Sequence, residues 1–201
     1  MSGSRKIRET INEILSDDSQ RERAKKFSCN KIKTQRATLD DLKDKFPEDI
    51  KIEHDTEQLD IVTNCYAFAL GLKDSAKYKE LCRLTYIGEN GSQKNGIQSG
   101  YIRYLLSQGH LQEAETPSKG CIVLYFNDEG EPKHAGILEK DGNDNDRMIR
   151  SRWGNFSATV THRVWHVPTM YGIEVKYYHP LTSEESENYF GEFLKDRGLE
   201  I

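Results

Sequence analysis

Two residues far apart in the chain, Cys65 and His134, have the types needed for nucleophilic catalysis. Cys65 follows Thr63 and Asn64, which are favoured N-cap residues, and an apolar run after it predicts a helix over residues 65–71. The free N–H groups and the dipole at a helix start lower the pKa of a thiol and stabilise an oxyanion. We therefore expect Cys65 to be a reactive thiol, with Asn64 as a further oxyanion donor. An isolated cysteine here would more often be a small buried core residue, so the assignment depends on a partner base.

His134 is the candidate base, because it begins the predicted strand HAGILE after the loop NDEGEPK. A position beside a loop suits an open cleft, and the small residues Ala135 and Gly136 leave room for a substrate backbone. A lone histidine of this kind is more often a surface residue. The combination of a helix-start cysteine with a strand histidine favours nucleophilic catalysis.

The elements around these residues follow an α+β pattern. Apolar residues at helical spacing predict helices over residues 5–15, 38–46, 75–84 and 97–106, and a capping box at Thr182 and Glu185 opens a last helix. Apolar runs between turn clusters predict strands in CIVLYF, HAGILE, RMIRSRW, TVTHRVWH and IEVKYY. Helices followed by a run of antiparallel strands indicate an α+β fold. We divide the chain into a helical N-terminal extension, residues 1–57, and a main domain, residues 58–201.

The order of NCYAFAL, PSKGCIVLYF, HAGILE and MIRSRWG resembles the papain-like NlpC and CHAP superfamily of cysteine peptidases and amidases. The resemblance covers about residues 60–155, and its strongest points are Cys65 and His134. It implies that residues 58–201 are a papain-like cysteine hydrolase domain, with helices packed on an antiparallel sheet. It also implies that Cys65 is the nucleophile and His134 the general base. Cys121 departs from the pattern, because the family usually has Asp after this glycine.

The resemblance places a third, orienting residue one strand after the histidine, at Arg150 or Ser151. A guanidinium group has only donors and cannot accept from an imidazole N–H, so Ser151 is the third catalytic candidate. Asn155 and His162 could also accept if the strands bend suitably. Trp153 and Asn155 are candidates for substrate binding, although Trp153 could equally pack the sheet against the last helix.

These residues predict acyl transfer from a peptide or protein substrate. The base takes the thiol proton, the thiolate attacks a carbonyl, and water hydrolyses the acyl-enzyme. An acyltransferase, deamidase or transglutaminase-like enzyme would share the acyl-enzyme and differ in the acceptor. An inactive papain-like domain that binds proteins is a further alternative. The lack of a wall-binding repeat or export signal favours a bacterial effector or toxin over a housekeeping cell-wall enzyme.

Composition excludes several other classes of protein. The 201 residues carry a net charge of −4, which argues against general nucleic-acid binding. No apolar run is long enough to cross a membrane and no secretory signal is visible, so we expect a cytoplasmic location or secretion by a non-Sec route. Ten basic against five acidic residues in the first 36 indicate a solvated helix or a docking element for a protein partner. We expect no cofactor and, despite the spacing of His162 and His166, no metal, because HExxH and paired cysteines are absent.

Overall fold

The computed structural model describes residues 2–16, 39–54, 63–84, 97–143, 146–153 and 158–198. Its centre is a six-stranded antiparallel sheet with the strand order β1-β5-β4-β3-β2-β6. The strands are β1 (Ile50–His54), β2 (Ile122–Phe126), β3 (Pro132–Lys140), β4 (Met148–Arg152), β5 (Ala158–Arg163) and β6 (Glu174–Tyr178). Strands β2 to β5 form a meander, and β1 and β6 add to its two edges. The expected α+β class is confirmed.

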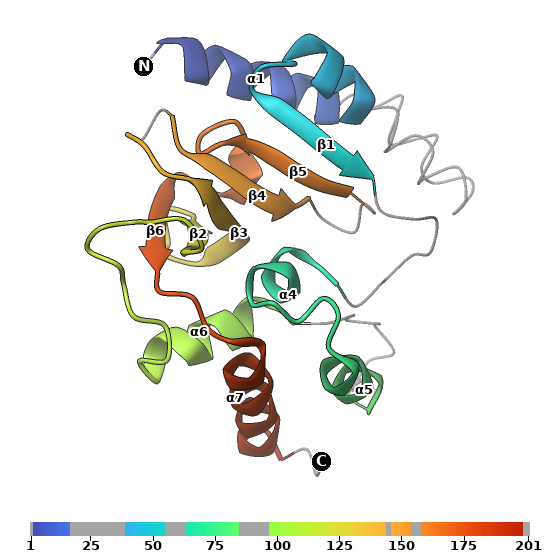
Figure 1. Ribbon diagram of the computed structural model, residues 1–201, viewed down its shortest axis with the longest axis vertical. Coiled ribbons are helices and arrows are strands. Elements are labelled where there is room, and N and C mark those ends of the chain that lie inside the picture. The colour runs from blue at the N-terminus through green and yellow to red at the C-terminus, as the bar shows by residue number, and fades with distance from the viewer. Residues whose placement is uncertain are drawn as a thin grey trace.

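Helices lie on both sides of this sheet (Figure 1). Helix α1 (Ser2–Ser16) and a helix over residues 39–45 run across the top of the view beside β1. Helices α4 (Cys65–Ala69), α5 (Ala76–Leu84), α6 (Ser99–Ser107) and α7 (Ser183–Asp196) gather below it, and the 3-10 turn η1 (Thr169–Tyr171) lies between β5 and β6. The helices expected over residues 5–15, 38–46 and 75–84 are confirmed, as is the capping box of Thr182 and Glu185 that begins α7.

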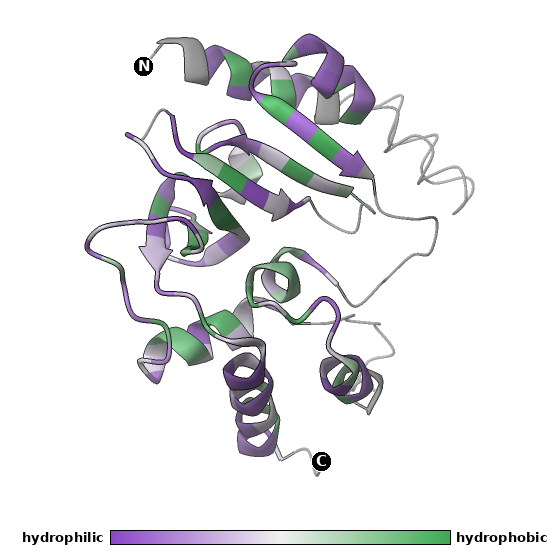
Figure 2. Ribbon diagram, in the orientation of Figure 1, coloured by the Kyte–Doolittle hydropathy of each residue, from purple (hydrophilic) through white to green (hydrophobic). Residues whose placement is uncertain are grey.

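Each face of the sheet has its own hydrophobic core. Along β2, Leu124 packs into the core below, while Val123 and Tyr125 pack into the core above. Side chains that alternate along a strand point to opposite faces, so a strand covered on both sides is apolar throughout, as in IVLYF. In Figure 2 the outer strand β1 instead alternates between hydrophobic and hydrophilic residues. The large buried residues are Tyr78, Tyr101 and Leu105 in the lower core and Ile11, Leu42 and Trp153 in the upper core.

The structure differs from the sequence expectation at residues 50–54, which lie in the segment taken as a helical extension. They form β1, which pairs with β5 from Ile50 opposite His162 to His54 opposite Ala158. Ile50 and Ile52 alternate with Lys51 and Glu53, a period of two that suits a half-buried edge strand. The segment before residue 58 therefore contributes to the same sheet as the candidate site.

Close approach of β3 and β4 explains Gly136. A Cβ atom at this position would lie 2.6 Å from Cγ2 of Ile149 and 2.9 Å from both the Arg150 carbonyl oxygen and Cβ of Ser151. The space beside Gly136 is thus filled by the neighbouring strand, and the expectation that it leaves room for a substrate is wrong. The glycine instead lets Ser151 pack directly against β3.

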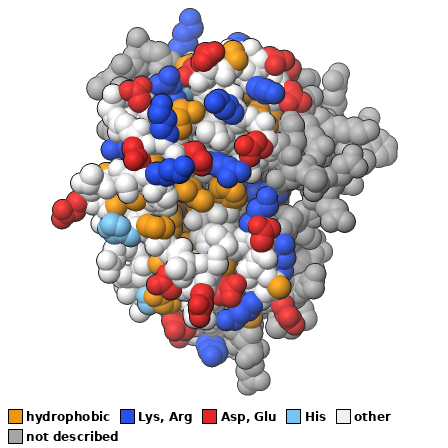
Figure 3. Space-filling model, viewed as in Figure 1, with side chains coloured by type: hydrophobic (Ala, Val, Ile, Leu, Met, Phe, Trp, Pro, Cys, Tyr) orange, Lys and Arg blue, Asp and Glu red, His pale blue; other side chains and the backbone are white. Residues whose placement is uncertain are grey.

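The surface in Figure 3 carries acidic and basic side chains interspersed across the face shown, with a band of hydrophobic side chains across its middle. No basic patch stands out on this face. Among the described helices, none combines the length and the apolar character that crossing a membrane requires.

Candidate functional site

Asn64 and a five-residue helix hold Cys65 in place. The Asn64 side-chain oxygen accepts hydrogen bonds from the backbone N–H groups of Tyr66 (3.0 Å) and Ala67 (3.1 Å), so this residue is the N-cap of α4. Its side-chain nitrogen donates to the carbonyl oxygen of Ile97. Both the oxygen and the nitrogen of the Asn64 side-chain amide therefore make hydrogen bonds within the protein. In this structure the residue that the sequence suggested as an oxyanion donor caps α4 and binds the backbone of Ile97.

Helix α4 packs against β3 and brings Cys65 to the start of that strand. The Tyr66 hydroxyl donates to the carbonyl oxygen of Pro132 at 2.7 Å. The backbone N–H of Ala135, the residue directly after His134 in the sequence, lies near enough to the Cys65 thiol to lower its pKa. The fold thus brings together the neighbourhoods of Cys65 and His134, which are 69 residues apart in the sequence.

Burial decides the protonation state of the thiol. Cys65 is 8% exposed, and its burial raises the pKa of the thiol to about 11, although hydrogen bonds from the backbone of Ala135, Tyr66 and Cys65 itself act in the opposite direction. The expectation of a lowered thiol pKa is wrong. Helix α4 has only five residues, so its aligned peptide dipoles are few, and desolvation of the charged form outweighs them. At neutral pH Cys65 is a neutral thiol.

His134 is buried and neutral as well. It is 1% exposed, and burial, followed by the nearby His162, lowers its pKa well below the usual value. Its ring lies parallel to the ring of Tyr171, with centroids 4.0 Å apart and an angle of 13°, and at 5.5 Å from the ring of Tyr125. Within the described residues, Nε2 of His134 has no hydrogen-bond partner. An uncharged imidazole with a free nitrogen is the form that a general base requires.

Ser151 belongs to a separate buried network beside this histidine. Nδ1 of His162 lies 2.8 Å from the carbonyl oxygen of Arg163, which can only accept, so Nδ1 carries the proton. Nε2 is then an acceptor for the Ser151 hydroxyl at 2.9 Å, and the same hydroxyl oxygen accepts from Nε1 of Trp153 at 3.1 Å. Ser151, expected as the orienting residue, is thus bonded to His162 and Trp153 rather than to His134.

The remaining predicted residues also have defined positions, with one exception. Trp153 is fully buried and packs its ring near those of His162 and Tyr171, so in this structure it belongs to the core rather than to an open groove. Asn155 lies outside the described residues. Tyr171 was missed by the sequence analysis, because nothing in the segment from Pro168 to Gly172 indicates a partner so far back in the chain.

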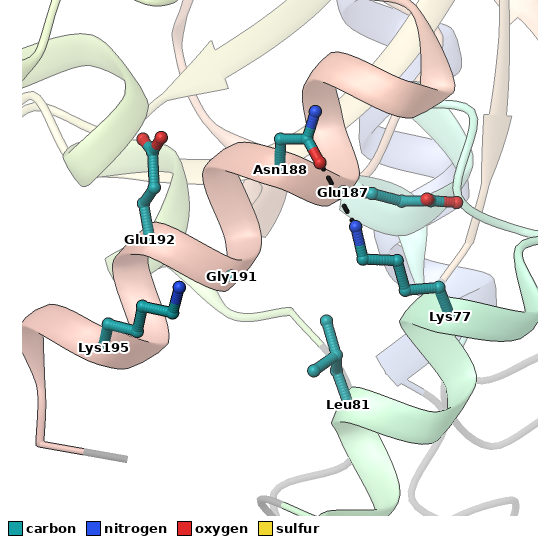
Figure 4. Close-up of a pocket in the computed structure, with 7 residues that line it drawn as sticks. All are labelled: Lys77, Leu81, Glu187, Asn188, Gly191, Glu192 and Lys195. Carbon is teal, nitrogen blue, oxygen red and sulfur yellow. Dashed lines mark hydrogen bonds between the residues drawn. The ribbon is translucent and has the colours of Figure 1, made fainter. Parts of the chain in front are cut away.

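A surface pocket of about 420 Å³ lies elsewhere, between α5 and α7 (Figure 4). Its lining mixes two lysines with two glutamates, and Lys77 donates to Asn188 across it at 3.2 Å. None of the residues predicted to act in catalysis lines this pocket.

Cys65 is thus an uncharged thiol and His134 an uncharged imidazole, which are the protonation states from which general-base activation of a thiol starts. No group of three or more histidine, cysteine or acidic residues in the described ranges is placed to hold a metal ion. Comparison of the chain with protein-family models, with curated proteins and with solved structures finds no match.

Proposed function

We propose that this protein is a papain-like cysteine hydrolase of the NlpC/CHAP type, which cleaves an amide bond through an acyl-enzyme on Cys65. The observation that carries this proposal is the position of the Cys65 thiol beside β3, near enough to the backbone N–H of Ala135 to lower the thiol pKa, one residue after the neutral His134 in the sequence. It brings the candidate nucleophile to the strand that carries the candidate base, with a backbone donor near the sulfur. The order of sequence motifs around both residues supports the same family.

In the proposed reaction His134 accepts the S–H proton while the sulfur forms a bond to the substrate carbonyl carbon. The C–N bond then breaks, and the imidazolium returns its proton to the departing amine. Water attacks the thioester with His134 again as the base, which releases the acid and restores the thiol. Backbone N–H groups near the sulfur would stabilise the oxyanion. Catalytic hydrogen bonds often tighten only when substrate binds, so a direct sulfur–imidazole bond is not required in the free protein.

The pH dependence of acylation tests this mechanism with p-nitrophenyl acetate as the probe. With a thiol pKa of about 11, roughly one molecule in ten thousand carries a thiolate near pH 7. Attack by free thiolate would therefore accelerate about tenfold for each pH unit up to about 11. Attack assisted by the neutral imidazole would instead be nearly independent of pH through the neutral range. We expect a flat profile for the wild type and a steep one for His134→Ala.

Cysteine variants identify the reacting thiol. Cys65→Ser should remove the burst of p-nitrophenolate, whereas Cys82→Ser, which changes another buried thiol, should leave it unchanged. Mass spectrometry of the quenched reaction should find the acetyl group on Cys65. Identical steep profiles in the wild type and His134→Ala would reject the proposed base.

The burial of both residues favours one second candidate, a papain-like domain that binds a protein without catalysis. Cys65 and His134 are 8% and 1% exposed, which is less than an open active site normally shows. This candidate predicts that Cys65→Ser and wild-type protein release p-nitrophenolate at the same rate.

A further inference from the structure

The ring of Tyr171 covers His134 in a defined geometry. The His134 and Tyr171 rings are nearly parallel, with centroids 4.0 Å apart, and the ring of Trp153 packs perpendicular to that of Tyr171, with centroids 6.0 Å apart and an angle of 86°. Burial, and to a smaller degree the charge that Cys65 would carry, raises the pKa of the Tyr171 phenol. Tyr171 therefore contacts the imidazole with its ring and lies close enough to the thiol for their charges to interact.

This contact takes the place of an orienting hydrogen bond. Nε2 of His134 has no hydrogen-bond partner among the described residues, and the hydroxyl of Ser151 is engaged by His162 and Trp153. Because Nε2 makes no hydrogen bond to fix the ring, the plane of the imidazole depends on the packing around it. Parallel contact at 4.0 Å restrains the plane of the imidazole, because rotation would drive it into the tyrosine ring.

Helix α1 holds the backbone on both sides of Tyr171. Arg8 donates to the carbonyl oxygens of Pro168 and Gly172, and the side-chain oxygen of Asn12 accepts from the backbone N–H of Thr169 at 2.9 Å. These two side chains therefore bind three backbone groups in the five residues from 168 to 172.

The far end of η1 is fixed to β2. Gly172 has a φ of +130°, and a Cβ there would lie 2.5 Å from the carbonyl oxygen of Phe126. The next residue, Ile173, donates its backbone N–H to the same oxygen at 2.7 Å. Tyr171 is thus held between an anchor on β2 and the side chains of α1, with little freedom to leave His134.

We propose that Tyr171 is the positioning residue for the His134 base and that α1, through Arg8 and Asn12, sets the position of Tyr171. This inference rests on the proposed function, because it assigns Tyr171 a role in the same reaction. Helix α1 would then help to support the active site, although it is far from Cys65 and His134 in the sequence. The described groups that face His134 are the rings of Tyr171, Tyr125 and His162.

The experiment measures acylation by p-nitrophenyl acetate across the neutral and alkaline range in variants of the full chain. Tyr171→Phe keeps the ring, so its acylation rate in the neutral range, where the profile is flat, should stay within about twofold of the wild-type rate. Tyr171→Leu loses the parallel contact and should lower that rate at least tenfold, toward the steep profile of His134→Ala, since small displacements of a catalytic group cost up to about a hundredfold. Arg8→Ala combined with Asn12→Ala should give an intermediate loss. Arg5→Ala, which removes only an exposed pair with Glu9 on the same helix, is the matched control.

Two further readouts separate positioning from general damage. Cys82 and Cys121 are buried, so iodoacetamide should reach them only if a variant opens the fold. If Tyr171→Leu opens the fold, the Arg8 and Asn12 variant decides the question.

The NMR signals of the His134 ring protons, shielded by the tyrosine ring, should move in Tyr171→Leu and stay in Tyr171→Phe.

The outcomes distinguish this inference from the proposed function. If the wild-type acylation rate is independent of pH near neutrality and Tyr171→Leu leaves that rate unchanged or raises it, the positioning role is overturned. A higher rate would show that Tyr171 blocks access to the site. Identical profiles in wild type and His134→Ala reject the proposed function and with it any catalytic role for Tyr171. In that case, if the NMR signals of His134 also do not move in Tyr171→Leu, the inference that Tyr171 restrains the His134 ring is rejected as well.

Discussion

Acid should destabilise this protein through His162, whose environment permits only the neutral ring. The side chain is fully buried, and its pKa is lowered to about 4, chiefly by burial and further by the nearby His166. In the native state Nδ1 donates to the Arg163 carbonyl and Nε2 accepts from Ser151, so a second ring proton would displace the serine hydroxyl. In the unfolded chain the same histidine binds a proton near pH 6.5.

The two pKa values set the sign and the size of the effect. Because the unfolded state takes up its proton first, the free energy of unfolding falls as the pH drops from about 6.5 toward about 4. The whole shift corresponds to roughly 3 kcal/mol, and roughly 2 kcal/mol of this is lost between about pH 7 and about pH 4.5. His134 and His166, whose pKa values are also lowered mainly by burial, add to the total loss in the wild type.

A comparison of pH differences isolates the contribution of His162. Urea denaturation at both pH values gives the loss of stability for the wild type and for His162→Gln, whose amide oxygen can still accept from Ser151. We expect the wild type to lose about 2 kcal/mol more than the variant. His179→Gln, which makes the same substitution at an exposed position, is the matched control. Equal losses in the wild type and His162→Gln would refute the argument.

Three further substitutions test other parts of the structure by their urea midpoints. Gly136→Ala should cost about 1–3 kcal/mol, because its Cβ would clash with Ile149 and the backbone of β4; an unchanged midpoint would contradict the close strand approach. Ser151→Ala should cost about 1–3 kcal/mol, because buried His162 and Trp153 each lose a partner, and a neutral effect would show that water replaces the hydroxyl. Thr182→Ala should cost about 1 kcal/mol through the lost cap of α7, and Thr182→Ser should restore most of it.

Local signals in the sequence were sufficient for most elements of the fold. The capping box at Thr182 and the apolar run from Ile122 to Phe126 depend on near neighbours, and both are confirmed. The strand at Ile50–His54 was missed because its alternating pattern is short and follows a helix ending near Pro47. Its pairing partner lies far along the chain, and no local pattern indicates such pairing.

The site was less predictable, because its properties depend on burial. A cysteine at a helix start indicates a lowered pKa only if water reaches the sulfur, and packing of α4 on β3 prevents this at Cys65. Ser151 was chosen for its ability to accept a hydrogen bond. The pattern could not show that His162, paired opposite Ile149 on the next strand, would occupy that hydroxyl.

The strand order has a consequence for how the chain folds. Strands β2 to β5 join neighbours in sequence, so this meander requires only short loops to close, whereas β1 must find β5 across roughly a hundred residues. The meander is therefore expected to form first, and β1 and β6 to dock on its edges afterwards. On the ribosome, the N-terminal residues would emerge early and wait for β5 before they could pair. After β5 has formed and before β1 docks, the edge of β5 would be open to other strands, which makes this the stage at which the chain is most prone to aggregate.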